Sequence, residues 1–132
     1  MVYIKTMKEI INTKEAPQPI GPYNQAVAAG GFLFISGQIA IDAASGALVT
    51  DEIGAETQLV LQNLKAILTA AGLTFDHIVK TTIFLSDMNN FSLINEIYGS
   101  YFTGDFPARE TVEVSVLPKN VNVEISAIAV KA

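Results

Sequence analysis

The chain has 132 residues, a formal net charge of −5 and no cysteine. A chain of this length normally forms one domain around a single core, and the lack of cysteine excludes a disulfide framework or a thiolate metal site. Its dispersed lysines form no basic stripe, and no stretch approaches the roughly 20 apolar residues that cross a bilayer. We therefore expect one cytoplasmic domain spanning residues 1–132, which binds a small molecule rather than a nucleic acid or a membrane.

The first part of the sequence predicts three strands, at residues 8–12, 25–29 and 32–36. A loop at 16–23 separates the first two strands, because its three prolines favour an extended, turning path. Gly30 and Gly31 lie between two apolar strands, which is typical of a two-residue hairpin turn. Residues 42–46 are rich in turn-forming types and predict a second turn.

Two amphipathic helices are predicted from the helical spacing of apolar residues, at residues 51–71 and 90–102. Thr50 or Asp51 is the expected cap of the first helix, and Gly72 is its expected end. The acidic group of Asp51, Glu52 and Glu56 at the helix start is expected to be solvated. Between the helices, residues 77–85 predict a mostly apolar strand in the interior of the sheet.

The last two predicted strands carry apolar residues at alternate positions, Val112, Val114 and Val116 on one and Val121, Val123 and Ile125 on the other. If Val116 faces Val121 across the four-residue loop 117–120, both rows lie on one buried side of the sheet. The same register places Arg109, Thr111 and Glu124 together on the other side. Only 16% of the residues are charged, so we expect this face to be covered by self-association.

Arg109 is the only arginine, and its planar cation is suited to hold a carboxylate with two hydrogen bonds. In the predicted register it lies about 13 Å along the strand from the position opposite Glu124, so the two side chains cannot form a simple cross-strand pair. Either Arg109 pairs with a carboxylate elsewhere in the chain, or a small anionic ligand lies between Arg109 and Glu124. The residue pattern leaves both possibilities open and favours the structural ion pair.

Four stretches together resemble the Rid family of reactive intermediate deaminases, also called the YjgF family: residues 20–23 (IGPY), 35–38 (ISGQ), 79–91 (VKTTIFLSDMNNF) and 106–109 (FPAR), the last continuing through 117–119 (LPK) to 124–125 (EI). The resemblance runs from Met7 to Ala132 and leaves residues 1–6 as an N-terminal extension, with Met7 as an alternative initiator. It implies an α+β fold like that of trimeric chorismate mutase, in which a mixed sheet carries two helices on one face. Three such sheets would pack around a central barrel, with clefts between the subunits.

Members of this family hydrolyse 2-imino acids and their enamines, such as 2-iminopropanoate and 2-aminoacrylate, to 2-keto acids and ammonia without a metal or another cofactor. The resemblance implies that Arg109 holds the substrate carboxylate, that Glu124 places the attacking water, and that the backbone at Thr111 orients this water and the imine nitrogen. Many members carry cysteine at the position of Thr111, so a thiol has no role here. The other implied substrate-binding residues are Tyr23, Ser36, Gly37 and Asn95.

Two other functions fit the sequence less well. A non-catalytic trimer could bind a small carboxylate and regulate a partner, but Glu124 then has no evident purpose. A ribonuclease or translation inhibitor is weaker still, because the chain is acidic and has one arginine and one histidine, His77. The sequence does not specify the preferred imine, the dehydratase that supplies it, or the effect of the short loop at 101–106.

Overall fold

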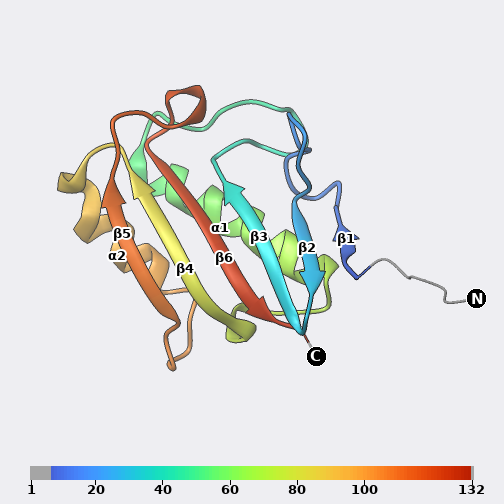
Figure 1. Cartoon of the computed structure of the whole chain (residues 1–132). Helices are drawn as coiled ribbons and strands as arrows, with labels where there is room; N and C mark the ends of the chain where they lie inside the picture. Colours follow the sequence, from blue (N-terminus) through green and yellow to red (C-terminus); the bar gives the residue numbers. More distant parts are fainter. Residues whose placement is uncertain (1–6, 132) are drawn as a thin grey trace, which may run out of the picture.

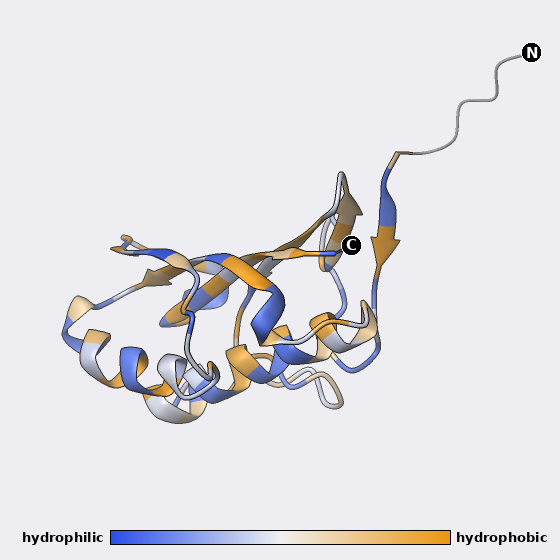
Figure 2. Ribbon diagram, turned by 90° about the horizontal axis from the view of Figure 1, so that it is seen from below, coloured by the Kyte–Doolittle hydropathy of each residue, from blue (hydrophilic) through white to orange (hydrophobic). Residues whose placement is uncertain are grey.

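The computed structural model describes residues 7–131, so the predicted extension at residues 1–6 lies outside the described residues. Six strands form one mixed sheet in the order β1-β2-β3-β6-β4-β5, and two α-helices lie on one of its faces (Figures 1 and 2). The strands are β1 Glu9–Ile11, β2 Ala26–Ala29, β3 Phe32–Gln38, β4 Ile78–Leu85, β5 Ala108–Glu113 and β6 Val123–Val130. The helices are α1 Ile53–Ala70 and α2 Phe91–Gly99. The predicted α+β architecture is confirmed, and within residues 7–131 no helix is long and apolar enough to span a membrane.

The hairpin of β2 and β3 forms as predicted. Its turn consists of Gly30 and Gly31 with φ of 58° and 85°, and backbone of this kind favours glycine because a side chain would be strained there. β1 pairs with β2, and β3 pairs on its other side with β6, both antiparallel. The three N-terminal strands therefore lie next to the C-terminal strand β6 in the sheet.

Helix α1 begins two residues later than predicted. Its cap is Glu52, whose carboxylate accepts hydrogen bonds from the backbone N–H groups of Gly54 and Ala55, so the assignment of Thr50 or Asp51 is wrong. Glutamate can take this role because its longer side chain reaches back to the first turn. Gly72, with φ of 77°, follows the helix end as expected.

Glu56 is fully buried, contrary to the expected solvated position. Its two carboxylate oxygens accept hydrogen bonds from Asn122 N at 2.7 Å, Asn122 Nδ2 at 2.8 Å and Val123 N at 3.2 Å. A buried carboxylate needs such partners, since an uncompensated charge in the interior is very costly. Glu56 therefore joins the first turn of α1 to the start of β6.

The predicted hairpin of the last two strands is wrong. β5 lies at the edge of the sheet and pairs in parallel with β4, whereas β6 lies between β3 and β4 (Figure 1). Strand β4, helix α2 and strand β5 form a crossover unit, and such a connection makes the two strands parallel. The chain then turns through a 3-10 segment at Pro118–Asn120, where Lys119 and Asn120 both have φ of 57°, and crosses β4 to reach its place in the sheet.

The two apolar rows have different environments because of this crossing. The row of Val121, Val123 and Ile125 is at most 1% exposed, as predicted. Val112 is 40% exposed, because β5 turns its side of the strand away from the helices, and Val116, which lies beyond the end of β5, is 65% exposed. Helix α2 is also shorter than predicted, since it ends at Gly99 rather than near residue 102.

Candidate functional site

The first part of the candidate site surrounds Arg109, which β5 places against helix α2. Its Nη1 donates a hydrogen bond to Asn95 Oδ1 at 2.7 Å. The guanidinium carbon lies 5.0 Å from the ring centre of Tyr98 and 5.7 Å from that of Phe91, within the range of cation–π attraction. A cavity of about 410 Å³ opens beside it and is lined by Asn95, Tyr98, Gly99, Phe106, Pro107 and Arg109.

No carboxylate balances the charge of Arg109 within residues 7–131. The one ion pair in this part of the chain joins Lys80 and Glu110 at 3.2 Å. The predicted structural ion pair of Arg109 is therefore wrong for the described residues. Because guanidinium carries five N–H donors and Asn95 takes one, Arg109 keeps donors that can hold an anionic ligand.

Thr111 lies two residues further along β5 and on the same face of the sheet as Arg109. Its Oγ1 is buried and has no hydrogen-bond partner. Buried hydroxyl groups are usually paired, and an unpaired one often marks a place that a ligand or water completes. The sequence predicted a role for the backbone of Thr111 only, and its side-chain hydroxyl is an additional polar group of the site.

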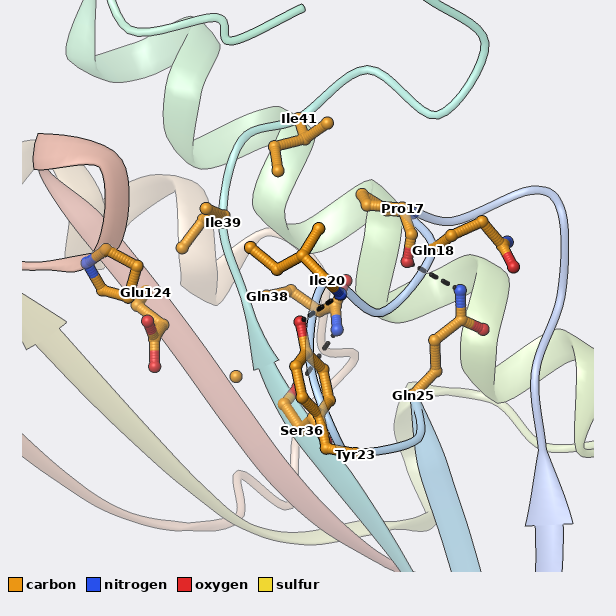
Figure 3. A pocket seen from close by; sticks show the side chains of 12 residues that line it. Pro17, Gln18, Ile20, Tyr23, Gln25, Ser36, Gln38, Ile39, Ile41 and Glu124 are labelled. Atoms are coloured by element: carbon orange, nitrogen blue, oxygen red, sulfur yellow. Dashed lines mark hydrogen bonds between the residues drawn. The ribbon is translucent and has the colours of Figure 1, made fainter. Parts of the chain in front are cut away.

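The second part of the candidate site surrounds Glu124 on β6. It is a cavity of about 400 Å³, shown in Figure 3, where the carboxylate of Glu124 and the ring of Tyr23 border the same space. Ser36 and Gly37 also line it, so four of the predicted site residues meet here. The other lining residues are Pro17, Gln18, Ile20, Gln25, Gln38, Ile39, Ile41 and Pro118.

Gly37 and Glu124 are in close contact. The pairing of β3 with β6 is irregular between Ile35 and Gln38, and Gly37 lies in this bulge. A Cβ atom at Gly37 would lie 2.8 Å from Glu124 Cδ and closer still to Oε2. The carboxylate thus occupies the space of a side chain, and any side chain at position 37 would displace it.

Glu124 is half-buried, and no residue in the range 7–131 donates a hydrogen bond to its carboxylate or forms an ion pair with it. Burial raises the pKa of the Glu124 carboxyl above its ordinary value. A carboxylate with a raised pKa and a free lone pair is suited to accept a proton from water.

The segment before β2 is held by a residue that sequence reasoning missed. Gln25 is 1% exposed, and its Nε2 donates to the carbonyl oxygens of Thr13, Ala16 and Pro17 at 3.0, 3.2 and 2.8 Å. These bonds fix the proline-rich loop that borders the Glu124 cavity. Ser36 Oγ also donates a hydrogen bond to this segment, to the carbonyl oxygen of Asn24. A glutamine directly before an apolar strand gives no signal of such a role, because its partners are backbone groups of a loop.

Arg109 and Glu124 lie on opposite faces of the sheet. Arg109 is paired with Thr81, and both contact helix α2, through Asn95 and Tyr98 respectively. Glu124 is paired with Phe84, whose strand neighbours Ile83 and Leu85 point into the core beneath the helices. The prediction that the two side chains share one face is wrong, since it depended on the hairpin register.

The seven predicted site residues therefore form two groups within one chain: Arg109, Thr111 and Asn95 near helix α2, and Tyr23, Ser36, Gly37 and Glu124 on the open face of the sheet. The first group can hold an anion, and the second can activate water. No three His, Cys, Asp or Glu side chains of the described range are grouped closely enough to hold a metal ion.

A family model described as Endoribonuclease L-PSP matches residues 13–131. A RutC family protein of Pyrococcus horikoshii is 54% identical over 125 residues, which are 95% of this chain and 99% of that protein. The 2-iminobutanoate/2-iminopropanoate deaminase of Mus musculus is 47% identical over 125 residues, which are 95% of this chain and 93% of the mouse protein. Among solved structures, a protein of the conserved Rid family from Yersinia pestis matches with a TM-score of 0.91 and 53% identity, over 93% of this chain and 98% of that one.

Proposed function

The chain belongs to the Rid family, also named YjgF or RutC, and we propose that it hydrolyses 2-imino acids such as 2-iminobutanoate and 2-iminopropanoate to 2-keto acids and ammonia. The observation that carries this proposal is the single arginine with no carboxylate partner among residues 7–131. It offers a two-pronged site for the carboxylate common to all these substrates. The similarity to the mouse deaminase covers nearly the whole of both chains and supports the same reaction.

We further propose that the active unit is a trimer in which Arg109 of one copy meets Glu124 of the next. The two residues lie on opposite faces of the sheet, so one chain cannot direct both at one small substrate. The open face also leaves large apolar side chains uncovered, with Phe32, Phe34 and Val130 each about 40 to 50% exposed. Packing of these faces around a central barrel would cover them and bring the two groups of site residues together.

The reaction then follows from the chemistry of the two groups. Arg109 of one copy, supported by Asn95, holds the substrate carboxylate. Glu124 of the other copy takes a proton from water as the water oxygen bonds to the imine carbon, and the proton passes to the nitrogen. The resulting carbinolamine then loses its hydroxyl proton to Glu124, and the amino nitrogen takes this proton up, so that the carbon–nitrogen bond breaks, ammonia leaves and the carbonyl of the 2-keto acid forms. Since an imine carbon is already electrophilic, placement of water and charge is enough to accelerate the reaction.

The remaining predicted residues border this reaction. Tyr23, Ser36 and Gly37 line the Glu124 cavity and would contact the imine and its side chain. The backbone of Thr111 would orient the water and the nitrogen, and its unpaired hydroxyl offers a second group for the same purpose. No cofactor takes part in this scheme, and a cytoplasmic location remains part of the proposal.

Subunit mixing tests the shared site. Arg109→Ala and Glu124→Gln should each be nearly inactive when measured alone for ammonia release from freshly generated 2-iminobutanoate. When the two variants are unfolded together and refolded, mixed trimers should regain a substantial fraction of the activity, because some interfaces contain an intact Arg109 and an intact Glu124. Two mixed variants that stay inactive would show that both residues act within one chain.

The family description Endoribonuclease L-PSP raises nuclease activity as a second possibility. The sole histidine, His77, lies on the surface outside both cavities, and its Nδ1 accepts a hydrogen bond from the backbone N–H of Thr74. The His77 ring therefore serves as a cap for the short 3-10 segment Phe75–His77. The acidic net charge of −5 also opposes binding to a phosphate backbone. These features favour the deaminase.

A further inference from the structure

Tyr98 of helix α2 contacts two side chains that are neighbours in the sheet. Thr81 on β4 and Arg109 on β5 are directly paired. The hydroxyl of Tyr98 lies 2.6 Å from Thr81 Oγ1, and its ring centre lies 5.0 Å from the guanidinium carbon of Arg109. Thr81 and Tyr98 are 1% and 4% exposed, so their two hydroxyl groups are enclosed by the protein.

We propose that Tyr98 is a positioning residue for Arg109, with Thr81 holding the tyrosine in place. The inference rests on the proposed role of Arg109 in holding the substrate carboxylate. A bidentate bond needs the guanidinium plane in one orientation, whereas a free arginine side chain samples many rotamers. Asn95 fixes one nitrogen, and the face of the Tyr98 ring limits rotation about that bond. The other N–H groups of Arg109, which lines the cavity, are then left for a ligand.

Packing alone does not account for the polar pair in this place. A phenylalanine and a valine would fill nearly the same volume without two buried hydroxyl groups, which must be paired to each other to avoid a desolvation penalty. The hydrogen bond between Tyr98 and Thr81 fixes the position of the ring along the helix-to-sheet gap. Because Thr81 is paired with Arg109 in the sheet, a ring tied to Thr81 is kept beside the guanidinium, whose carbon lies 5.0 Å from the ring centre.

The experiment compares two double variants that remove the same hydrogen bond. Thr81→Val with Tyr98→Leu removes the ring and strands neither hydroxyl, whereas Thr81→Val with Tyr98→Phe keeps the ring. Affinity is measured by titration calorimetry with 2-ketobutanoate, a carboxylate of the product class that requires no turnover. We expect the leucine pair to weaken binding about 3- to 10-fold and the phenylalanine pair to weaken it less than about 3-fold, from the strength of a cation–π contact. The KM of the deaminase reaction should rise in parallel, with a smaller change in kcat.

The same substitutions in an Arg109→Ala background decide the mechanism. If Tyr98 acts through Arg109, replacing its ring should have no further effect there. Equal losses in both backgrounds, equal losses for the two double variants, or no binding of 2-ketobutanoate by the wild-type protein would each overturn the inference. Failure of the proposed function looks different, because the wild-type protein would then bind 2-ketobutanoate with the predicted dependence on Tyr98 but release no ammonia from the imine.

Discussion

Gly37→Ala tests the placement of Glu124 directly. Gly37 has no positive φ, so alanine introduces no backbone strain, and the three atoms nearest to the added Cβ all belong to Glu124. The added Cβ would lie 2.8 Å from Glu124 Cδ, whereas carbon atoms approach to about 3.5 Å at best, so the carboxylate has to retreat by roughly 0.7 Å or more. Because the half-buried side chain can rotate away, we expect the fold to survive.

A misplacement of this size near a reacting centre costs on the order of 100-fold in rate, or about 2.7 kcal/mol of transition-state stabilisation. The assay is ammonia release from 2-iminobutanoate generated in place by an amino-acid oxidase, with the melting temperature measured beside it. The matched control is Gly37→Ala in a Glu124→Ala background, where the carboxylate is gone and the extra methyl has room. There the second substitution should change the residual rate less than about 3-fold. A wild-type rate for Gly37→Ala, or the same decrease in both backgrounds, would refute the assigned role of the contact.

Four further outcomes are expected. Arg109→Ala should remove roughly 2–5 kcal/mol of carboxylate binding with the fold intact, and Arg109→Lys should restore little of it because an ammonium lacks the planar fork; calorimetry with 2-ketobutanoate measures both. Burial raises the pKa of Glu124, so the acidic limb of the pH–rate profile should have its midpoint above the ordinary glutamate pKa, which is near 4.3. A midpoint at or below that value would contradict the assignment of Glu124 as the base. The pKa of Glu124 is higher in the folded state than in the unfolded state, so the ionised carboxylate destabilises the fold above the folded-state pKa, and this destabilisation is lost as pH falls through that pKa. Glu124→Gln should therefore slow turnover yet raise the melting temperature at pH 7. Glu56→Ala should lower the free energy of unfolding by about 3 kcal/mol in urea titrations, because three donors of Asn122 and Val123 lose their acceptor.

Much of the fold could be predicted from local patterns. The paired glycines at 30 and 31 predicted a hairpin, and the apolar spacing of residues 51–71 predicted a helix that the structure shows at Ile53–Ala70, because each pattern is satisfied by neighbours in the chain. The order of the last strands could not be obtained in this way. An alternating run such as Val112 to Val116 fits either side of a sheet, and only its pairing partner decides which residues are buried. The strand–helix–strand sequence from β4 to β5 was the available signal for parallel pairing.

The site residues were identified through the family resemblance, whereas their arrangement depended on the strand order. With the hairpin register, Arg109 and Glu124 shared a face; with β6 inserted between β3 and β4, they do not. The close contact of Gly37 and Glu124 also depends on a bulge in strand pairing, for which a single glycine is a weak sign. Long-range pairing therefore limits what a single sequence can predict about this site.

The location of Arg109 and Glu124 on opposite faces of one sheet determines how many active sites a defective subunit inactivates in a mixed trimer. In the proposed trimer each subunit contributes its arginine to one interface and its glutamate to another. A single subunit defective in only one of these residues then inactivates one site of three, while a subunit defective in both inactivates two. Co-expression of the double variant with the wild-type chain should thus be more dominant than co-expression of either single variant, although all three would be equally inactive by themselves.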